Sequence, residues 1–179
     1  MGLIPNPVNT ATIDYKPLEI TDKTTILLGV NEWNKYAKGI PYFEAALEII
    51  NENYADKVEI LKVTSLPYQE YIRLYERAHI LLDQVLAYDQ GYNALEAMAR
   101  GKVVFTGAEQ EFLSYYGLEE NEICFNALPD PKDIASKLIE LIENPDRIKV
   151  IGSNARSFIE REHDYKKVAA QYVQMYTKN

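Results

Sequence analysis

The sequence predicts an α/β fold: a Rossmann-like, doubly wound parallel sheet with extra C-terminal helices. Short apolar segments rich in β-branched residues alternate along the chain with segments of about ten residues whose apolar side chains recur at helical spacing. Such alternation favours parallel strands joined by right-handed crossover helices. The first of these segments, at 25–30, is suited to a strand buried on both faces.

The first strand is predicted at 25–30, within the run TTILLGV, which is β-branched and aliphatic. A helix follows it. Pro41 stands where a first helical residue would, and Phe43, Ala46 and Ile50 recur at helical spacing.

The same alternation continues in the next part of the chain. Residues 58–63 and 79–83 are strand-like, and 68–77 between them is helical with Tyr71 and Tyr75 on one side. These elements give the order β-α-β-α-β from residue 25 onward.

Two more helix and strand pairs follow. The pattern predicts a helix at 91–100 closed by Gly101, a strand at 103–106, a helix at 108–116 and a short strand at 123–125.

The C-terminal part of the chain is predicted to be helical. Asp130 is a favourable N-cap, Pro131 a favourable first helical residue, and Asp133 stands at the capping-box position. Residues 144–145 end this helix and open the next, and the remainder is divided into two helices near residues 163–164.

The chain divides into a lead-in and one domain. Residues 1–24 carry Pro5, Pro7 and Pro17 among polar residues, a composition that favours extended or turning backbone and is interpreted as a linker. Residues 25–179 are predicted to form one domain, because a chain of this length is ordinarily a single unit.

Composition excludes several classes of partner. A net charge of −8 and a pI near 4.9 disfavour nucleic acid, whose binding is driven by clustered Lys and Arg. No run approaches the roughly 20 apolar residues of a membrane span, and no basic amphipathic stretch is present. Cys124 is the only cysteine, which fits a reducing compartment, and a cytoplasmic location is expected.

No metal site is predicted. His79 and His163 are far apart in sequence and show no metal-ligand spacing, and a single cysteine cannot form a cysteine cluster.

Ligands of doubly wound sheets bind beyond the carboxyl ends of the strands, where helix N-termini present unpaired N–H groups. Function is therefore expected in four loops, at residues 31–40, 64–67, 84–91 and 106–109.

A motif follows the third of these loops. Gly91 is followed after four residues by Glu-Ala-Met-Ala at 96–99, then by Gly101 and the strand at 103–106. This arrangement resembles that of the retaining glycosyltransferases of the GT-B fold, the group 1 or glycogen-synthase-like family. The resemblance implies a donor-binding domain for a nucleoside diphosphate sugar.

The resemblance implies roles for the residues of the motif. Gly91 would leave room for a ligand, and the N–H groups of Tyr92 and Asn93 would face phosphate oxygens. The resemblance places Glu96 on the ribose hydroxyls. Without the resemblance, Glu96 is interpreted as a solvated glutamate on the surface of a helix.

A second match is the pair Lys38-Gly39 before the first helix, which resembles a Lys-Gly pair of the family. The resemblance puts Lys38 at the leaving diphosphate, where its ammonium would act electrostatically. The family usually has an arginine several residues earlier, and Lys35 is the candidate substitute here. A solvated loop lysine is the alternative for both positions.

The sequence also departs from the family pattern. Tyr88 occupies the position of the first of two expected glutamates, so Asp89 next to it is a candidate replacement at the donor sugar and a candidate catalytic residue. Residues 83–84 are Asp-Gln where relatives often have Pro-Ser; a ligand contact and a structural loop role are both open. Leu66 and Tyr68 are candidate contacts of the base or sugar.

The ends of the chain extend the resemblance, since 4–9 is similar to the segment that joins the two domains of these enzymes and 165–176 to their terminal helix. A longer parent with a preceding acceptor domain is therefore expected.

The expected activity is transfer of a hexosyl group from a UDP- or GDP-sugar to a glycan or other acceptor, with retention and without a metal or other cofactor, as in polysaccharide biosynthesis. The chain alone is expected to bind donor weakly and transfer nothing. The alternatives are a nucleotide-sugar epimerase and, because Tyr88 replaces a glutamate, a non-catalytic nucleotide-binding or scaffolding module.

Overall fold

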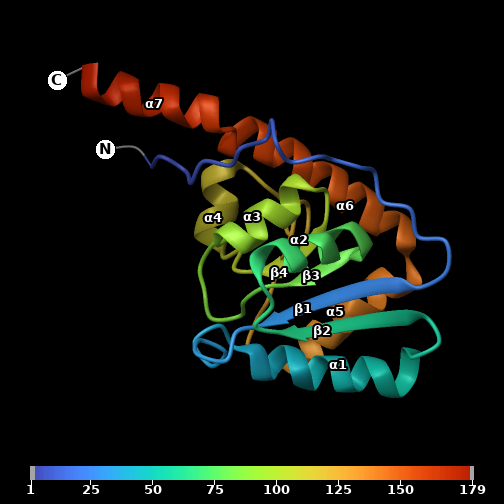
Figure 1. The fold of residues 1–179 in the computed structure, drawn as a ribbon. Coiled ribbons are helices and arrows are strands. Elements are labelled where there is room, and N and C mark those ends of the chain that lie inside the picture. The colour runs from blue at the N-terminus through green and yellow to red at the C-terminus, as the bar shows by residue number, and fades with distance from the viewer. Residues whose placement is uncertain (1–2, 178–179) are drawn as a thin grey trace.

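The computed structural model describes residues 3–177. The predicted lead-in and the predicted domain therefore each lose two terminal residues, at 1–2 and 178–179, which lie outside the described residues. Its centre is a five-stranded sheet of order β2-β1-β3-β4-β5 in which every neighbouring pair is parallel (Figure 1). The strands are β1 (Thr24–Val30), β2 (Val58–Thr64), β3 (Ile80–Leu82), β4 (Val103–Thr106) and β5 (Phe125–Asn126). The predicted doubly wound α/β fold is confirmed.

Helices cover both faces of the sheet (Figure 1). The helices are α1 (Ile40–Tyr54), α2 (Tyr68–Arg77), α3 (Tyr92–Ala99), α4 (Gln110–Tyr116), α5 (Pro131–Glu143), α6 (Pro145–Phe158), the π-helical turn η1 (Ile159–His163) and α7 (Tyr165–Thr177). The chain leaves β1 through α1 toward the edge strand β2, and from β2 onward it moves the other way across the sheet. Right-handed crossovers therefore place α1 on one face and α2, α3 and α4 on the other.

The strands separate two apolar layers. Ile26 and Leu28 pack with the helices α1 and α5 on one face, and Leu27 between them packs with α2 and α3 on the other. The same alternation holds in β3, where Leu81 points away from its two neighbours. All of these side chains are buried, which explains why no polar residue alternates with them in the sequence.

The helix α6 joins the two layers at one edge of the sheet. Ile148 and Ile151 near its start belong to the α1 and α5 layer, whereas Ala155 and Phe158 near its end belong to the α2 and α3 layer. The extra C-terminal helices thus close the core as well as extending beyond it.

Local signals for helix ends are also found in the structure. Gly101 has φ 74°, a left-handed conformation that suits glycine after a helix. Asp130 caps α5 by accepting hydrogen bonds from the N–H groups of Lys132 and Asp133. The sequence places Asp133 at the capping-box position. In the structure its carboxylate instead binds the Lys137 ammonium at 2.7 Å.

The lead-in packs against the rest of the chain. The N–H of Val8 donates to the carbonyl of His163 at 2.7 Å, and the N–H of Tyr165 donates to the carbonyl of Val8 at 3.0 Å. Val8 and Leu18 are buried. Figure 1 shows this segment running beside α6 before it enters β1. The division of the chain at residue 24 stays a prediction.

The break predicted near residues 163–164 separates η1 from α7. Asp164 has extended backbone, and its carboxylate accepts the N–H groups of Lys166 and Lys167 at the start of α7. No helix within residues 3–177 combines the length and apolar character needed to cross a bilayer.

Candidate functional site

The carboxyl edge of the sheet has a switch point between β1 and β3. The connection after β1 enters α1 on one face, and the connection after β3 enters α3 on the other, so the two loops diverge and leave a crevice. A cavity of about 220 Å³, here called the switch-point cavity, lies there. Lys38 and Asn93 both line it, as do Leu66 and Ser65. The structure thus brings together three of the predicted site residues.

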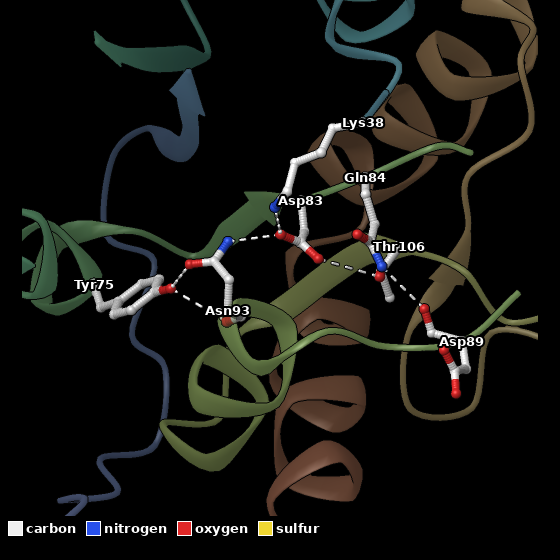
Figure 2. Close-up of polar contacts among 7 residues, drawn as sticks. All are labelled: Lys38, Tyr75, Asp83, Gln84, Asp89, Asn93 and Thr106. Carbon is white, nitrogen blue, oxygen red and sulfur yellow. Dashed lines mark hydrogen bonds and ion pairs between the residues drawn. The ribbon is translucent and has the colours of Figure 1, made fainter. Parts of the chain in front are cut away.

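Asp83 joins the two sides of this crevice. It follows β3, its side chain has no exposed surface, and its Oδ1 lies 2.9 Å from Nζ of Lys38. The Asn93 side-chain amide donates to the same oxygen at 2.7 Å, and the Thr106 hydroxyl lies 3.4 Å from Oδ2 (Figure 2). A buried carboxylate requires such partners, because desolvating an unpaired charge is costly.

Asn93 is held from both ends. The Tyr75 hydroxyl donates to Oδ1 of Asn93, while Nδ2 of Asn93 faces Asp83 (Figure 2). Burial raises the pKa of Tyr75 well above its ordinary value, so its hydroxyl keeps the proton that it donates. The amide of Asn93 is therefore fixed in one orientation at the first turn of α3.

The N-terminus of α3 has no side-chain cap. The first helical bond runs from the N–H of Leu95 to the carbonyl of Gly91, so the N–H groups of Tyr92 and Asn93 have no acceptor within the helix. A Cβ placed on Gly91 would meet nothing closer than the Gln84 amide at 3.7 Å. This is an ordinary van der Waals distance, so the protein's own packing does not require glycine here.

Lys38 owes its position to the glycine after it. Gly39 has φ 69°, and a Cβ on it would lie 2.8 Å from the Cβ of Val85. The N–H of Val85 also donates to the carbonyl of Lys38 at 2.8 Å. The pair Lys38-Gly39 is thereby fastened to the loop after β3, which supplies a physical reason for a glycine at this position.

Glu96 lies one turn along α3 from Asn93, and residues three apart share a helix face. The Tyr68 hydroxyl lies 2.9 Å from each of its carboxylate oxygens. Burial and this hydrogen bond raise the pKa of Tyr68, so its hydroxyl is a donor. The residue predicted for the ribose and a residue predicted for the base therefore meet on the side of α3 that faces α2.

Other predicted residues lie elsewhere. The Lys35 ammonium pairs with Glu32 at 2.7 Å and is not among the residues that line the switch-point cavity. Tyr88 and Asp89 line a different cavity of about 510 Å³. We call it the tyrosine cavity; its principal side chains are Tyr88, Asp89, Glu109, Glu111, Tyr115 and Tyr116. Tyr92 is exposed at the start of α3.

The loops after β3 and β4 are interlocked. A Cβ on Gly107 would lie 2.3 Å from the carbonyl oxygen of Ala87. The Gln90 amide donates to the carbonyl of Gly107 at 2.7 Å, and the N–H of Glu109 donates to the carbonyl of Tyr88 at 3.2 Å. The Gln84 amide braces the same loop by donating to the carbonyl of Asp89 (Figure 2).

Two residues have a larger part in the site than the sequence indicates. The sequence leaves Asp83 open as a ligand contact or a structural residue, and the structure places it at the centre of the polar cluster. Asn34 belongs to no motif, yet it lines the switch-point cavity, and its buried Oδ1 has no hydrogen-bond partner among residues 3–177. A charged residue that ends an apolar strand at a switch point is the signal that could have identified Asp83.

No group of three His, Cys, Asp or Glu side chains within residues 3–177 is placed to hold a metal ion.

The strand order, the two helix layers and the polar crevice define a Rossmann-like α/β domain with a ligand crevice at its switch point. The chain belongs to the glycosyl transferase-like family, whose model matches residues 22–174. The predicted family resemblance is thereby confirmed. A comparison with curated protein sequences found no significant match.

Solved structures share this fold. The C-terminal domain of a group 1 family glycosyl transferase (LpcC) from Francisella tularensis has a TM-score of 0.67 and 18% identity, with 88% of this chain and 98% of that domain covered. Sucrose-phosphate synthase from Thermosynechococcus elongatus has a TM-score of 0.71 and 19% identity, with 99% and 52% covered. HepE from Anabaena in complex with UDP has a TM-score of 0.56 and 17% identity, with 88% and 41% covered. This chain thus spans about half or less of the latter two proteins.

Proposed function

We propose that this domain binds a nucleoside diphosphate sugar of the UDP or GDP type, and that the protein transfers the hexosyl group to an acceptor with retention. The observation that carries the proposal is that Lys38 and Asn93, the second residue of the uncapped helix α3, line one cavity at the switch point. Ammonium and helix N–H groups are the donors that a diphosphate requires. The likeness of the fold to HepE, solved with UDP, supports the nucleotide class.

Lys38 can serve a ligand while it is bonded to Asp83. An ammonium has three donors, and Asp83 takes one of them in the structure. The side chain of Lys38 is 30% exposed, so its other donors are accessible from the cavity side. Asp83 fixes the position of the ammonium, and this preorganisation lowers the cost of aligning it with a phosphate.

A metal is not needed in this proposal. The leaving diphosphate gathers negative charge as the glycosidic bond breaks, and the helix N-terminus and Lys38 stabilise that charge. Glu96 is proposed to accept hydrogen bonds from the ribose hydroxyls, with Tyr68 as its neighbour. A preceding domain is proposed to complete the acceptor site, consistent with the partial coverage of the longer relatives. This domain alone is then expected to transfer nothing.

Thermal shift and calorimetry with UDP, GDP, UDP-glucose and GDP-mannose test the proposal, because a ligand that binds only the folded state raises the melting temperature. The matched variants are Lys38→Met combined with Asp83→Asn, which removes both members of the pair, and Lys35→Met, which removes a lysine outside the cavity. The first is expected to weaken nucleotide binding about tenfold or more, and the second to leave it unchanged. Absence of binding by all four nucleotides would reject the proposal.

A second candidate is a non-catalytic nucleotide-binding module. It is favoured by Tyr88, which stands where the family pattern has a glutamate. Nucleotide binding without turnover of any nucleotide sugar by a version of the protein that includes the proposed acceptor domain would support it. Turnover that interconverts sugars on the nucleotide would instead indicate an epimerase.

A further inference from the structure

The tyrosine cavity is larger than the switch-point cavity and is lined by different residues. Its volume is about 510 Å³, and its walls come from residues 88–90, from the start and end of α4, from lead-in residues 3–6 and from His163. A volume in this range suits one or two sugar rings or a small organic ligand. The function proposed above does not use this cavity.

Aromatic side chains are presented to solvent at this cavity. Tyr88 is 82% exposed and Tyr115 is 58% exposed, whereas Tyr116 is partly buried. Tyr115 and Tyr116 pack edge to face, with ring centroids 4.7 Å apart. Exposed rings of this size are costly to leave in water and gain when an apolar face covers them. The C–H face of a sugar ring is such a surface.

The polar groups of the cavity carry negative charge. Asp89, Glu109 and Glu111 are among its lining residues, and no lysine or arginine within residues 3–177 lines it. Ionised carboxylates only accept hydrogen bonds. They suit the hydroxyl groups of a neutral ligand and repel phosphate or carboxylate groups.

His163, which also lines the cavity, is uncharged. Its ring is 5% exposed, its Nδ1 lies 2.8 Å from the carbonyl oxygen of Asn6, and its buried Nε2 has no partner among residues 3–177. Burial lowers the pKa of His163, so the ring is neutral. Since a carbonyl oxygen can only accept, Nδ1 carries the proton and Nε2 presents a lone pair. His163 therefore adds no charge to the cavity.

We propose that the tyrosine cavity binds an uncharged sugar ring, stacked on Tyr115 and bonded through its hydroxyls to the carboxylates. We further assign this ring to the glycosyl acceptor, an assignment that rests on the proposed function. Residues 88–90 lead directly into Gly91 at the tip of α3. A sugar in this cavity therefore lies one loop away from the proposed diphosphate position.

Amide NMR of the isotope-labelled chain tests this site without any nucleotide. The probes are methyl α-glucoside, methyl α-mannoside, methyl α-galactoside and maltotriose, with methyl α-glucuronide as the charged counterpart. At least one neutral probe is expected to give saturable shifts at residues 88–90 and 109–116. Tyr115→Ala is expected to weaken its binding about fivefold, as loss of a stacked aromatic contact would. Tyr176→Ala, which removes a tyrosine 78% exposed on α7, is the control and should leave binding unchanged.

The proposal is overturned if no neutral probe shifts these resonances, if the glucuronide binds as tightly as the glucoside, or if Tyr115→Ala has no more effect than the control. A separate titration with UDP and GDP reports on residue 38 and residues 91–96. Sugar binding without nucleotide binding would support the sugar site and reject the proposed function. Nucleotide binding without sugar binding would do the reverse.

Discussion

The Lys38 ammonium lies 2.9 Å from the Asp83 carboxylate and joins the loop before α1 to the end of β3 across the switch point. The pair is asymmetric, because the side chain of Lys38 is 30% exposed and that of Asp83 is fully buried. Lys38 alone could turn toward water, but Asp83 could not. The carboxylate is therefore the member that depends on its partner.

This asymmetry predicts how substitutions of Lys38 and Asp83 change the free energy of unfolding. Lys38→Met leaves a buried carboxylate without its counter-charge and is expected to lower the free energy of unfolding by about 3 kcal/mol. Adding Asp83→Asn should restore most of the loss, since the amide needs no counter-charge. Urea unfolding of the two variants measures both effects. Equal free energies of unfolding for the single and double variants would contradict the dependence of the Asp83 carboxylate on Lys38.

A second prediction concerns Glu96 and the ribose. If its carboxylate accepts the ribose hydroxyls, Glu96→Gln should weaken UDP or GDP binding about tenfold, in line with the loss of hydrogen bonds to a charged group. The wild-type protein should also prefer the nucleotide to its 2′-deoxy form, and the variant should lose that preference. Calorimetry with both nucleotides measures it. A preference that survives the substitution contradicts the role of Glu96, and Tyr68→Phe tests whether its neighbour contributes.

Gly39 and Gly117 form a matched pair for the loop that carries Lys38. Both have positive φ, 69° and 64°, but a Cβ on Gly39 would lie 2.8 Å from Val85 whereas one on Gly117 would meet nothing within 4 Å. Gly117→Ala should cost about 1 kcal/mol for the left-handed backbone. Gly39→Ala should cost at least about 1 kcal/mol more and weaken nucleotide binding. Similar losses for both variants in urea unfolding would exclude the steric part of the explanation.

The burial of Lys102 is expected to make the free energy of unfolding depend on pH. Burial lowers the pKa of Lys102 to about 8, against an ordinary value of 10.5 in the unfolded chain. Between these values the unfolded chain binds more protons than the folded one, so stability from this group rises with pH through that window and is at its lowest below pH 8. Lys102→Met is therefore expected to raise the free energy of unfolding by about 2 kcal/mol at pH 7.

The gain should shrink as the pH approaches 10.5, because wild-type Lys102 then loses its charge in both states. Lys132→Met, at an exposed position on α5, should show no such trend. Urea unfolding at pH 7 and pH 10 measures the difference. A constant gain at both pH values would attribute the effect to apolar packing.

Much of the architecture could be read from local patterns. The strands at residues 25–30 and 103–106 were identifiable because burial on both faces leaves an apolar run in which polar residues do not alternate with apolar ones. Gly101 and Asp130 marked helix ends for reasons that act within a few residues, namely a left-handed conformation and a capped N–H group. Such signals survive folding because they do not depend on distant partners.

The polar cluster could not be read in the same way. The partners of Asp83 lie 45, 10 and 23 residues away in sequence, and only the strand order brings Lys38, Asn93 and Thr106 to one carboxylate. The separation of Tyr88 and Asp89 from Lys38 was also hidden, because the fold of the loop after β3 decides which cavity each side chain faces. Family resemblance suggested residues but not their grouping.

The contact between Gly107 and the Ala87 carbonyl leaves no room for even a methyl group. The loops after β3 and β4 therefore meet main chain to main chain at that point. The relative position of these two loops, which carry Tyr88 and Glu109 of the tyrosine cavity, is thus set by backbone contact rather than by side-chain packing.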